Sequence, residues 1–244
     1  MDGRIKCGER EAMFPITREL WSCLGDDGLE LEVRLRQTGY DGGVSRETFD
    51  RIMHVLDTGP SLNIWCSRHE AVSAVMLGKN GRRSVIDGIG TEAEKAVRYE
   101  HKRRIRATDV SLCGGEFTAR MILSSEHAVR AVSAPCALVR LRHRTSFGFH
   151  PTRTEGTEGQ FSYDLTRVWT GCSLEALLEQ MRTGADPTAY EVEIELTDMA
   201  YVTEKLPRDR AVLSLLLKLT DLTDAVCGGW SGSGSGESAA PAQQ

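Results

Sequence analysis

Two segments near opposite ends of the chain alternate strictly between apolar and charged residues: LELEVRLR at residues 29–36 and YEVEIEL at residues 190–196. This period of two is typical of a β-strand that buries one face in a core. The other face is charged throughout, with Glu30, Glu32, Arg34 and Arg36 on the first strand and Glu191, Glu193 and Glu195 on the second. Because like charges along a strand repel, the pattern predicts a cation bound between the two strands.

The central part of the chain also has the pattern of β-strands. Segments bounded by Gly, Asp, Asn and Pro predict strands at residues 62–66, 70–77, 82–88, 99–106, 117–126, 136–144 and 161–169. Capping residues predict three helices: Ser45 before 46–56, Ser173 before a helix that ends at Met181, and Pro207 before a Leu-rich segment that ends at Gly228. This content is mainly β, and the two acidic strands become neighbours if the sheet closes into an antiparallel barrel.

Length and composition predict one folded domain between two loose ends. The chain has 244 residues, of which 40% are hydrophobic. We expect a flexible segment at residues 1–13, the domain at 14–227, and a disordered Gly/Ser-rich tail at 228–244. No apolar run resembles a membrane span or a signal peptide, so a soluble intracellular protein with no membrane contact is expected. The formal net charge of −5 excludes a global field that attracts nucleic acid.

Several kinds of chemistry are excluded or disfavoured by missing motifs. The seven cysteines form no C-x-x-C pair and no zinc-ligand spacing, so they are expected to be reduced thiols. A cysteine phosphatase needs an Arg six positions after its Cys, and Cys113 and Arg120 miss that spacing by one residue. A P-loop is absent, which excludes the usual form of nucleotide hydrolysis.

Basic residues gather on strands other than the acidic ones. One predicted strand carries Arg140, Arg142 and Arg144 on a single face, and another contains the run EHKRR at 100–104. For any one strand, a solvated charged face is a sufficient explanation. The segregation of carboxylates from guanidiniums over several strands instead favours a polyphosphate ligand, held by a divalent cation on one side and by arginines on the other.

These strands resemble those of a known superfamily. The segments Glu30-Leu-Glu-Val-Arg34, Arg140-Leu-Arg-His-Arg144 and Glu191-Val-Glu-Ile-Glu195 are similar to strands of the triphosphate tunnel metalloenzymes. The match is closest to the metal-dependent RNA 5′-triphosphatases of fungi and protozoa, with support from residues 100–105, 117–126 and 163–168. The resemblance covers roughly residues 14–205. It implies an eight-stranded antiparallel β-barrel whose lumen holds the triphosphate, flanked by a few helices.

The resemblance also implies roles for individual residues. Manganese or magnesium is expected to bind Glu30, Glu32 and Glu195. The attacking water is expected to be oriented by Glu193 and Glu126. Phosphate groups are expected to be held by Arg34, Arg83, Lys102, Arg140, Arg142 and Arg144. Further lumen partners are expected to be Asp87, Asp164, Thr166 and Glu191. The alignment leaves open whether Lys102 or Arg103 contacts phosphate, and Arg142 stands where the family often has Lys.

The implied function is removal of the γ-phosphate from triphosphate-ended RNA, the first step of mRNA capping, which implies a nuclear protein. Because the sequence lacks the Lys-x-Asp-Gly nucleophile motif, a separate guanylyltransferase is the expected partner. Two alternatives stay open: a tunnel hydrolase of inorganic triphosphate, polyphosphate or nucleoside triphosphate, and a polyphosphate-binding module without activity. The low net charge predicts that the body of the RNA is contacted little.

Overall fold

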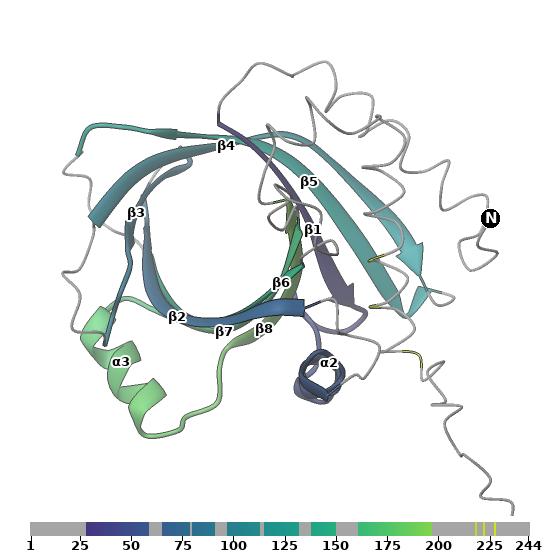
Figure 1. Cartoon of the computed structure of the whole chain (residues 1–244). Helices are drawn as coiled ribbons and strands as arrows, with labels where there is room; N and C mark the ends of the chain where they lie inside the picture. The colour runs from purple at the N-terminus through teal and green to yellow at the C-terminus, as the bar shows by residue number, and fades with distance from the viewer. Residues whose placement is uncertain are drawn as a thin grey trace, which may run out of the picture.

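A computed structural model describes residues 28–58, 65–78, 80–90, 97–112, 115–131, 138–149 and 161–196, together with Lys218, Leu222 and Cys227. The part of the chain described contains eight strands and two helices (Figure 1). In chain order they are β1 (Leu29–Gln37), α2 (Arg46–Thr58), β2 (Trp65–Leu77), β3 (Arg82–Ile86), β4 (Val97–Leu112), β5 (Phe117–Ala128), β6 (Leu138–Phe149), β7 (Phe161–Gly171), α3 (Leu174–Arg182) and β8 (Ala189–Leu196).

The strands form one closed antiparallel barrel in the order β1-β5-β4-β3-β2-β6-β7-β8. The barrel closes where the two acidic strands, β1 and β8, pair with each other. Glu32 lies opposite Glu195 in this pairing, and Arg34 lies opposite Glu193. The predicted mainly β fold, its eight-stranded closed barrel and its flanking helices are therefore confirmed.

Three predicted strand boundaries are wrong. The predicted strands 62–66 and 70–77 are one continuous strand, β2, because the polar residues between them pair without a break with β6 from Ser67 onward. β4 runs to Leu112 rather than ending at 106, and a β-bulge between Arg104 and Arg106 reverses the alternation that the prediction relied on. β6 extends to Phe149 rather than ending at 144.

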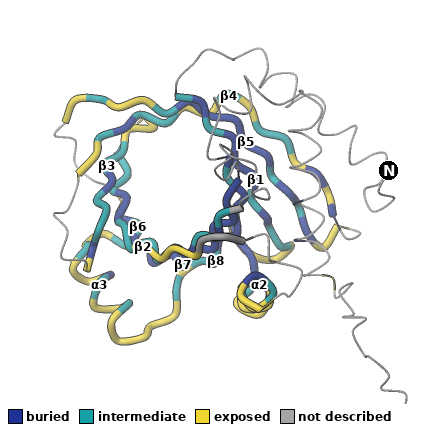
Figure 2. The backbone as a smooth tube through the Cα atoms, in the orientation of Figure 1, coloured by how far each residue is buried: buried dark blue, intermediate teal, exposed yellow. Residues whose placement is uncertain are grey.

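The apolar face of the barrel points outward rather than into the lumen. The apolar residues of β1 and β8, such as Leu35 and Val192, belong to a core that also contains Phe49 and Ile52 of α2. A second core lies between the barrel wall and α3, around Leu141, Trp169 and Leu177. Figure 2 shows the buried residues concentrated along β1, β5, β7 and β8. This arrangement leaves the charged faces of the strands directed into the barrel.

Two close turns fix neighbouring strands. Asn80 and Gly81, between β2 and β3, have positive φ values of 58° and 75°, a left-handed conformation that Asn and Gly adopt more readily than other residues. Gly43, between β1 and α2, lies so close to β8 that an added Cβ would come within 2.3 Å of the Tyr190 carbonyl oxygen. The Val44 amide donates to that same oxygen at 2.9 Å, which ties the chain leaving β1 to β8.

The predicted ends of the chain and most of the predicted Leu-rich helix lie outside the described residues. Within that segment, Leu222 is buried in the outer core, and the Lys218 ammonium lies 4.8 Å from the Phe161 ring centroid. The prediction of reduced thiols is wrong for Cys227, which forms a disulfide, whereas Cys172 is free and exposed. Among the described helices, neither is long and apolar enough to cross a membrane.

The packing of α3 yields a test of the outer core. Leu177 is the buried residue of α3 and contacts the β6–β7 wall, so Leu177→Ala is expected to lower the free energy of unfolding by about 2–5 kcal/mol. The exposed neighbour Gln180 gives a matched control, and Gln180→Ala is expected to change stability by less than about 0.5 kcal/mol. Urea denaturation followed by tryptophan fluorescence measures both. Equal stability of the two variants would contradict this packing.

Candidate functional site: a charged tunnel

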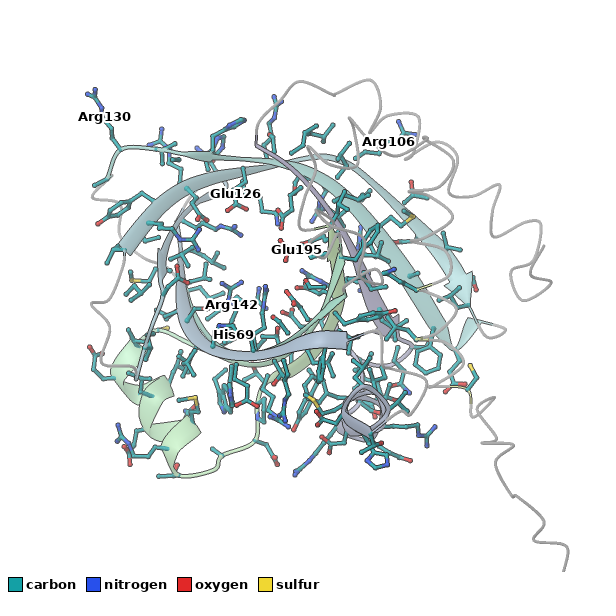
Figure 3. The ribbon with its side chains drawn as sticks, viewed as in Figure 1. His69, Arg106, Glu126, Arg130, Arg142 and Glu195 are labelled. Carbon is teal, nitrogen blue, oxygen red and sulfur yellow. The ribbon has the colours of Figure 1, made fainter. Side chains whose placement is uncertain are left out.

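The barrel encloses a cavity of about 570 Å³ whose lining is almost entirely charged. Figure 3 shows Glu126, Arg142 and Glu195 pointing into the enclosed space from three different strands. Twelve of the fifteen predicted site residues line it: Glu30, Glu32, Arg34, Arg83, Lys102, Glu126, Arg140, Arg142, Arg144, Glu191, Glu193 and Glu195. The alternation of each strand places these side chains together, because residues two apart share a face.

Two β1 carboxylates converge on one cation. Lys102 Nζ lies 2.5 Å from Glu30 Oε2 and 3.4 Å from Glu32 Oε2. The Ser124 hydroxyl donates to Glu30 at 3.2 Å, which fixes that carboxylate further. Burial, followed by the charge of Glu193, raises the pKa of Glu32 above its ordinary value. The two carboxylates are thus held on either side of a single point of positive charge.

Glu193 and Glu195 are two residues apart on β8, but their pKa values are shifted in opposite directions. Although burial alone would raise the pKa of Glu193, the guanidiniums of Arg34 and Arg144 lower it to about 2. Arg34 Nε donates to Glu193 at 2.7 Å. Burial and the neighbouring Asp164 raise the pKa of Glu195 to about 8, against the effect of Arg144, whose guanidinium is 3.6 Å away. Glu193 is therefore a fixed carboxylate, while Glu195 takes up a proton at neutral pH.

The three arginines of β6 differ in how well they are neutralised. Arg140 donates to Glu191 at 2.8 Å, and Arg144 donates to Asp164 at 2.6 Å. Arg142, between them, forms no ion pair with any described residue, and its buried Nε has no hydrogen-bond partner. Burial and the adjacent Arg144 lower the pKa of Arg142 to about 10. Burying a guanidinium without a partner costs free energy. Arg142 is therefore suited to bind an anion from a ligand.

A second ion-pair chain crosses β3, β4 and β5. Arg83 donates to Glu100 at 2.9 Å and to Glu126 at 2.5 Å. Arg98 contacts Glu100 at 2.8 Å and also lines the cavity. Sequence analysis gave no role to Arg98 or Glu100, although both alternate with Lys102 along the same strand. That spacing of two was the signal that could have identified them.

The remaining predictions for individual residues need correction or refinement. Asp87 does not line the cavity: its carboxylate accepts from Arg98 Nε at 2.8 Å and is 41% exposed. Asp164 and Thr166 are buried and are not among the cavity-lining residues, and within the described part of the chain Asp164 Oδ1 and the Thr166 hydroxyl have no hydrogen-bond partner. Of the basic run at 102–104, only Lys102 lines the cavity: Arg103 faces the opposite side of the strand, and Arg104 is exposed beside the β-bulge.

The donor set fits a divalent metal. Among the residues described, no group of three His, Cys, Asp or Glu side chains is gathered as a metal centre. However, Glu30 and Glu32 already share one cation, the Lys102 ammonium, and Glu195 faces Glu32 across the β1–β8 pairing. Carboxylate oxygens are the ligands that magnesium and manganese prefer. Burial, followed by the charge of Asp164, raises the pKa of Glu195, and a bound divalent cation would favour its ionised form.

Comparison with known proteins identifies the fold. No family model and no curated protein sequence matches the chain. The structure of the S. pombe Pct1 RNA triphosphatase matches with a TM-score of 0.63 and 12% identity, over 90% of this chain and 93% of that one. The monoclinic mimivirus capping enzyme triphosphatase matches with a TM-score of 0.54 and 15% identity, over 91% and 99%. The predicted resemblance is thus confirmed for the fold: the chain has the tunnel fold of these fungal and viral RNA triphosphatases.

The unequal neutralisation of Arg142 and Arg144 predicts opposite effects on stability. Arg144→Met leaves Asp164 without its guanidinium, removes one of the two guanidiniums beside Glu193, and is expected to lower the free energy of unfolding by about 3–5 kcal/mol. Arg142→Met removes an unpaired buried charge and is expected to raise that free energy by about 1 kcal/mol. Chemical denaturation without ligand measures both. A loss of stability in Arg142→Met as large as that in Arg144→Met would contradict this account.

Proposed function

We propose that the protein is a metal-dependent polynucleotide 5′-triphosphatase that hydrolyses the γ-phosphate of triphosphate-ended RNA to leave a diphosphate end. The single observation that carries the proposal is the lumen itself, in which carboxylates and guanidiniums face one another and Arg142 forms no ion pair with any residue that the structure describes. The fold similarity to the Pct1 and mimivirus RNA triphosphatases supports the same reaction class.

The cationic side chains would hold the triphosphate. Arg142 has a free buried donor, and Arg140 and Arg144 flank it on the same strand face. Across the cavity, Arg34, Arg83 and Lys102 are each paired with carboxylates and supply further positive charge. Guanidiniums suit this task because they stay charged when enclosed and offer paired donors to phosphate oxygens.

The carboxylates would have two roles: some would bind the metal, and others would orient the attacking water. Glu30, Glu32 and Glu195 would hold Mn²⁺ or Mg²⁺, which when bound neutralises charge on the phosphate. Glu193 stays ionised because its pKa is about 2, so it suits orienting a water molecule by accepting a hydrogen bond rather than storing a proton. Glu126, held by Arg83, is the second candidate for this role.

The reaction would place the protein at the start of mRNA capping. The protein would then act in the nucleus beside the guanylyltransferase activity that uses the diphosphate end. A mimivirus relative is described as the triphosphatase domain of a trifunctional mRNA capping enzyme, and Pct1 has been solved with the Spt5 CTD. Both descriptions support this setting.

Hydrolysis is tested directly by phosphate release from triphosphate-ended RNA in the presence of Mn²⁺. Wild type is expected to release one phosphate per RNA end. Glu30→Ala and Glu193→Ala are expected to lose at least about 100-fold in rate, because each removes a charge placed at the reacting group. Glu70→Ala, which removes an exposed carboxylate outside the cavity, is the matched control and is expected to retain full activity.

Two outcomes would count against the proposal: no release by wild type, or undiminished release by Glu30→Ala. Parallel assays with tripolyphosphate and ATP separate the proposal from its alternatives. Faster turnover of tripolyphosphate than of RNA would favour an inorganic polyphosphatase, and binding without turnover would favour a binding module.

Metal binding is expected to depend on pH through Glu195. Because its pKa is about 8 without metal, the metal must displace a proton at neutral pH. The apparent affinity for Mn²⁺ is therefore expected to rise roughly tenfold per pH unit up to about pH 8 and then level off. Isothermal titration calorimetry measures both the affinity and the proton release. Glu195→Gln, which cannot ionise, is the control, and an equally steep pH dependence in this variant would exclude Glu195 as the source.

A further inference from the structure

The outer surface of the wall formed by β3, β4 and β5 is basic. In the pairing of these strands, Arg82 lies opposite His101, and His101 lies opposite His127. Their sequence neighbours Arg83, Lys102 and Glu126 line the cavity, so the row of Arg82, His101 and His127 faces outward. Arg103 lies on this same outer face, two residues from His101 on β4.

The arginines of this surface are exposed and lack internal partners. Arg82, Arg103 and Arg130 are all exposed, and none forms an ion pair with a described residue. Figure 3 shows Arg130, just beyond the end of β5, pointing away from the barrel. We define the outer basic face by five residues: Arg82, His101, Arg103, His127 and Arg130.

No described carboxylate interrupts this face. The other outward residues of the same strand segments are Ser84, Ile86, Val97, Tyr99 and Ser125, which carry no charge. Elsewhere on the described surface, several exposed arginines are paired: Arg46 with Asp186, Arg51 with Glu47, and Arg182 with Glu179. The outer basic face is therefore a local excess of positive charge on a chain whose formal net charge is −5.

The position of this face relates it to the cavity. It is the back of the same wall whose inner side carries Arg83, Lys102 and Glu126. Arg98 belongs to both surroundings, since it lines the cavity while its side chain is 56% exposed. The wall is a sheet one strand thick, so a single-stranded RNA whose 5′ end lies in the cavity reaches the outer face by turning around the rim of the barrel.

We propose that the outer basic face binds the phosphate backbone of the first nucleotides of the RNA whose 5′ triphosphate occupies the cavity. The assignment rests on the proposed function for the identity of the polyanion. Arginines spaced along a sheet suit a phosphodiester backbone, and Tyr99 on the same face offers a ring on which a base can stack. The proposal departs from the expectation that the RNA body is contacted little, because a low net charge is compatible with a local basic surface.

The proposal is tested by charge reversal on this face. The double variant Arg82→Glu/Arg103→Glu is expected to weaken binding of a 5′-hydroxyl RNA of about 12 nucleotides by at least tenfold at low salt. The slope of log affinity against log salt is expected to become shallower by about 0.7 for each lost phosphate contact. Fluorescence anisotropy measures both. Hydrolysis of tripolyphosphate, which does not reach the outer face, is expected to stay at the wild-type rate.

A matched control separates a local contact from a change in overall charge. Arg182→Glu reverses the charge of an exposed arginine on α3. In a buffer whose salt screens long-range electrostatic interactions, it is expected to leave RNA affinity within about twofold of wild type. Arg130→Glu, outside the strands, tests the same face without risk to the sheet and is expected to weaken RNA binding about fivefold.

The outcomes distinguish this proposal from the proposed function. Wild-type RNA affinity in the double variant and in Arg130→Glu would overturn the RNA-binding role, as would an equal loss in Arg182→Glu. If wild type hydrolyses no triphosphate at all, the proposed function fails, while binding of 5′-hydroxyl RNA still decides the role of the outer face. Loss of binding to an acidic peptide with unchanged RNA affinity would assign the face to a protein partner instead.

Discussion

Opposite charges facing one another across a closed lumen are the interaction on which this structure depends. The barrel packs its apolar residues outward, against α2, α3 and Leu222, so the inner faces of the strands have no core to fill. Enclosing charged side chains in this way destabilises the fold unless they are paired. The antiparallel pairing of β1 with β8 provides such partners, because it sets Arg34 beside Glu193.

Some charged groups of the lumen have no partner among the described residues, and these groups indicate where ligands would bind. Glu195 retains a proton near neutrality, and among the described residues Arg142 has no carboxylate partner and one oxygen of Asp164 has no donor. A fold optimised only for stability would fill these positions with apolar residues. A metal cation at the carboxylate end and a phosphate chain along β6 would satisfy the unpaired groups together, which is why the same residues account for both proposed ligands.

The alternation of charge in β1, β6 and β8 was sufficient to predict the barrel and most of its lining, because a period of two assigns each side chain to a face. The alternation alone was insufficient where the neighbours of a residue depend on the register between paired strands. Arg98 and Glu100 were missed because their importance depends on the register of β4 with β3, which sets Glu100 opposite Arg83. The basic run at 102–104 was treated as one unit, although Arg103 faces away from the lumen. Asp87 was expected in the lumen because the family resemblance implied it, whereas β3 ends at Ile86 and Asp87 pairs with Arg98.

The central claim is that a triphosphate binds inside the barrel, and a crystal structure of the protein with tripolyphosphate and Mn²⁺ tests it most directly. The account predicts the metal between Glu30, Glu32 and Glu195, with phosphate oxygens within hydrogen-bond distance of Arg142. It would be contradicted by a lumen in which Lys102 still bridges Glu30 and Glu32 while the anion and metal lie only on the outer surface.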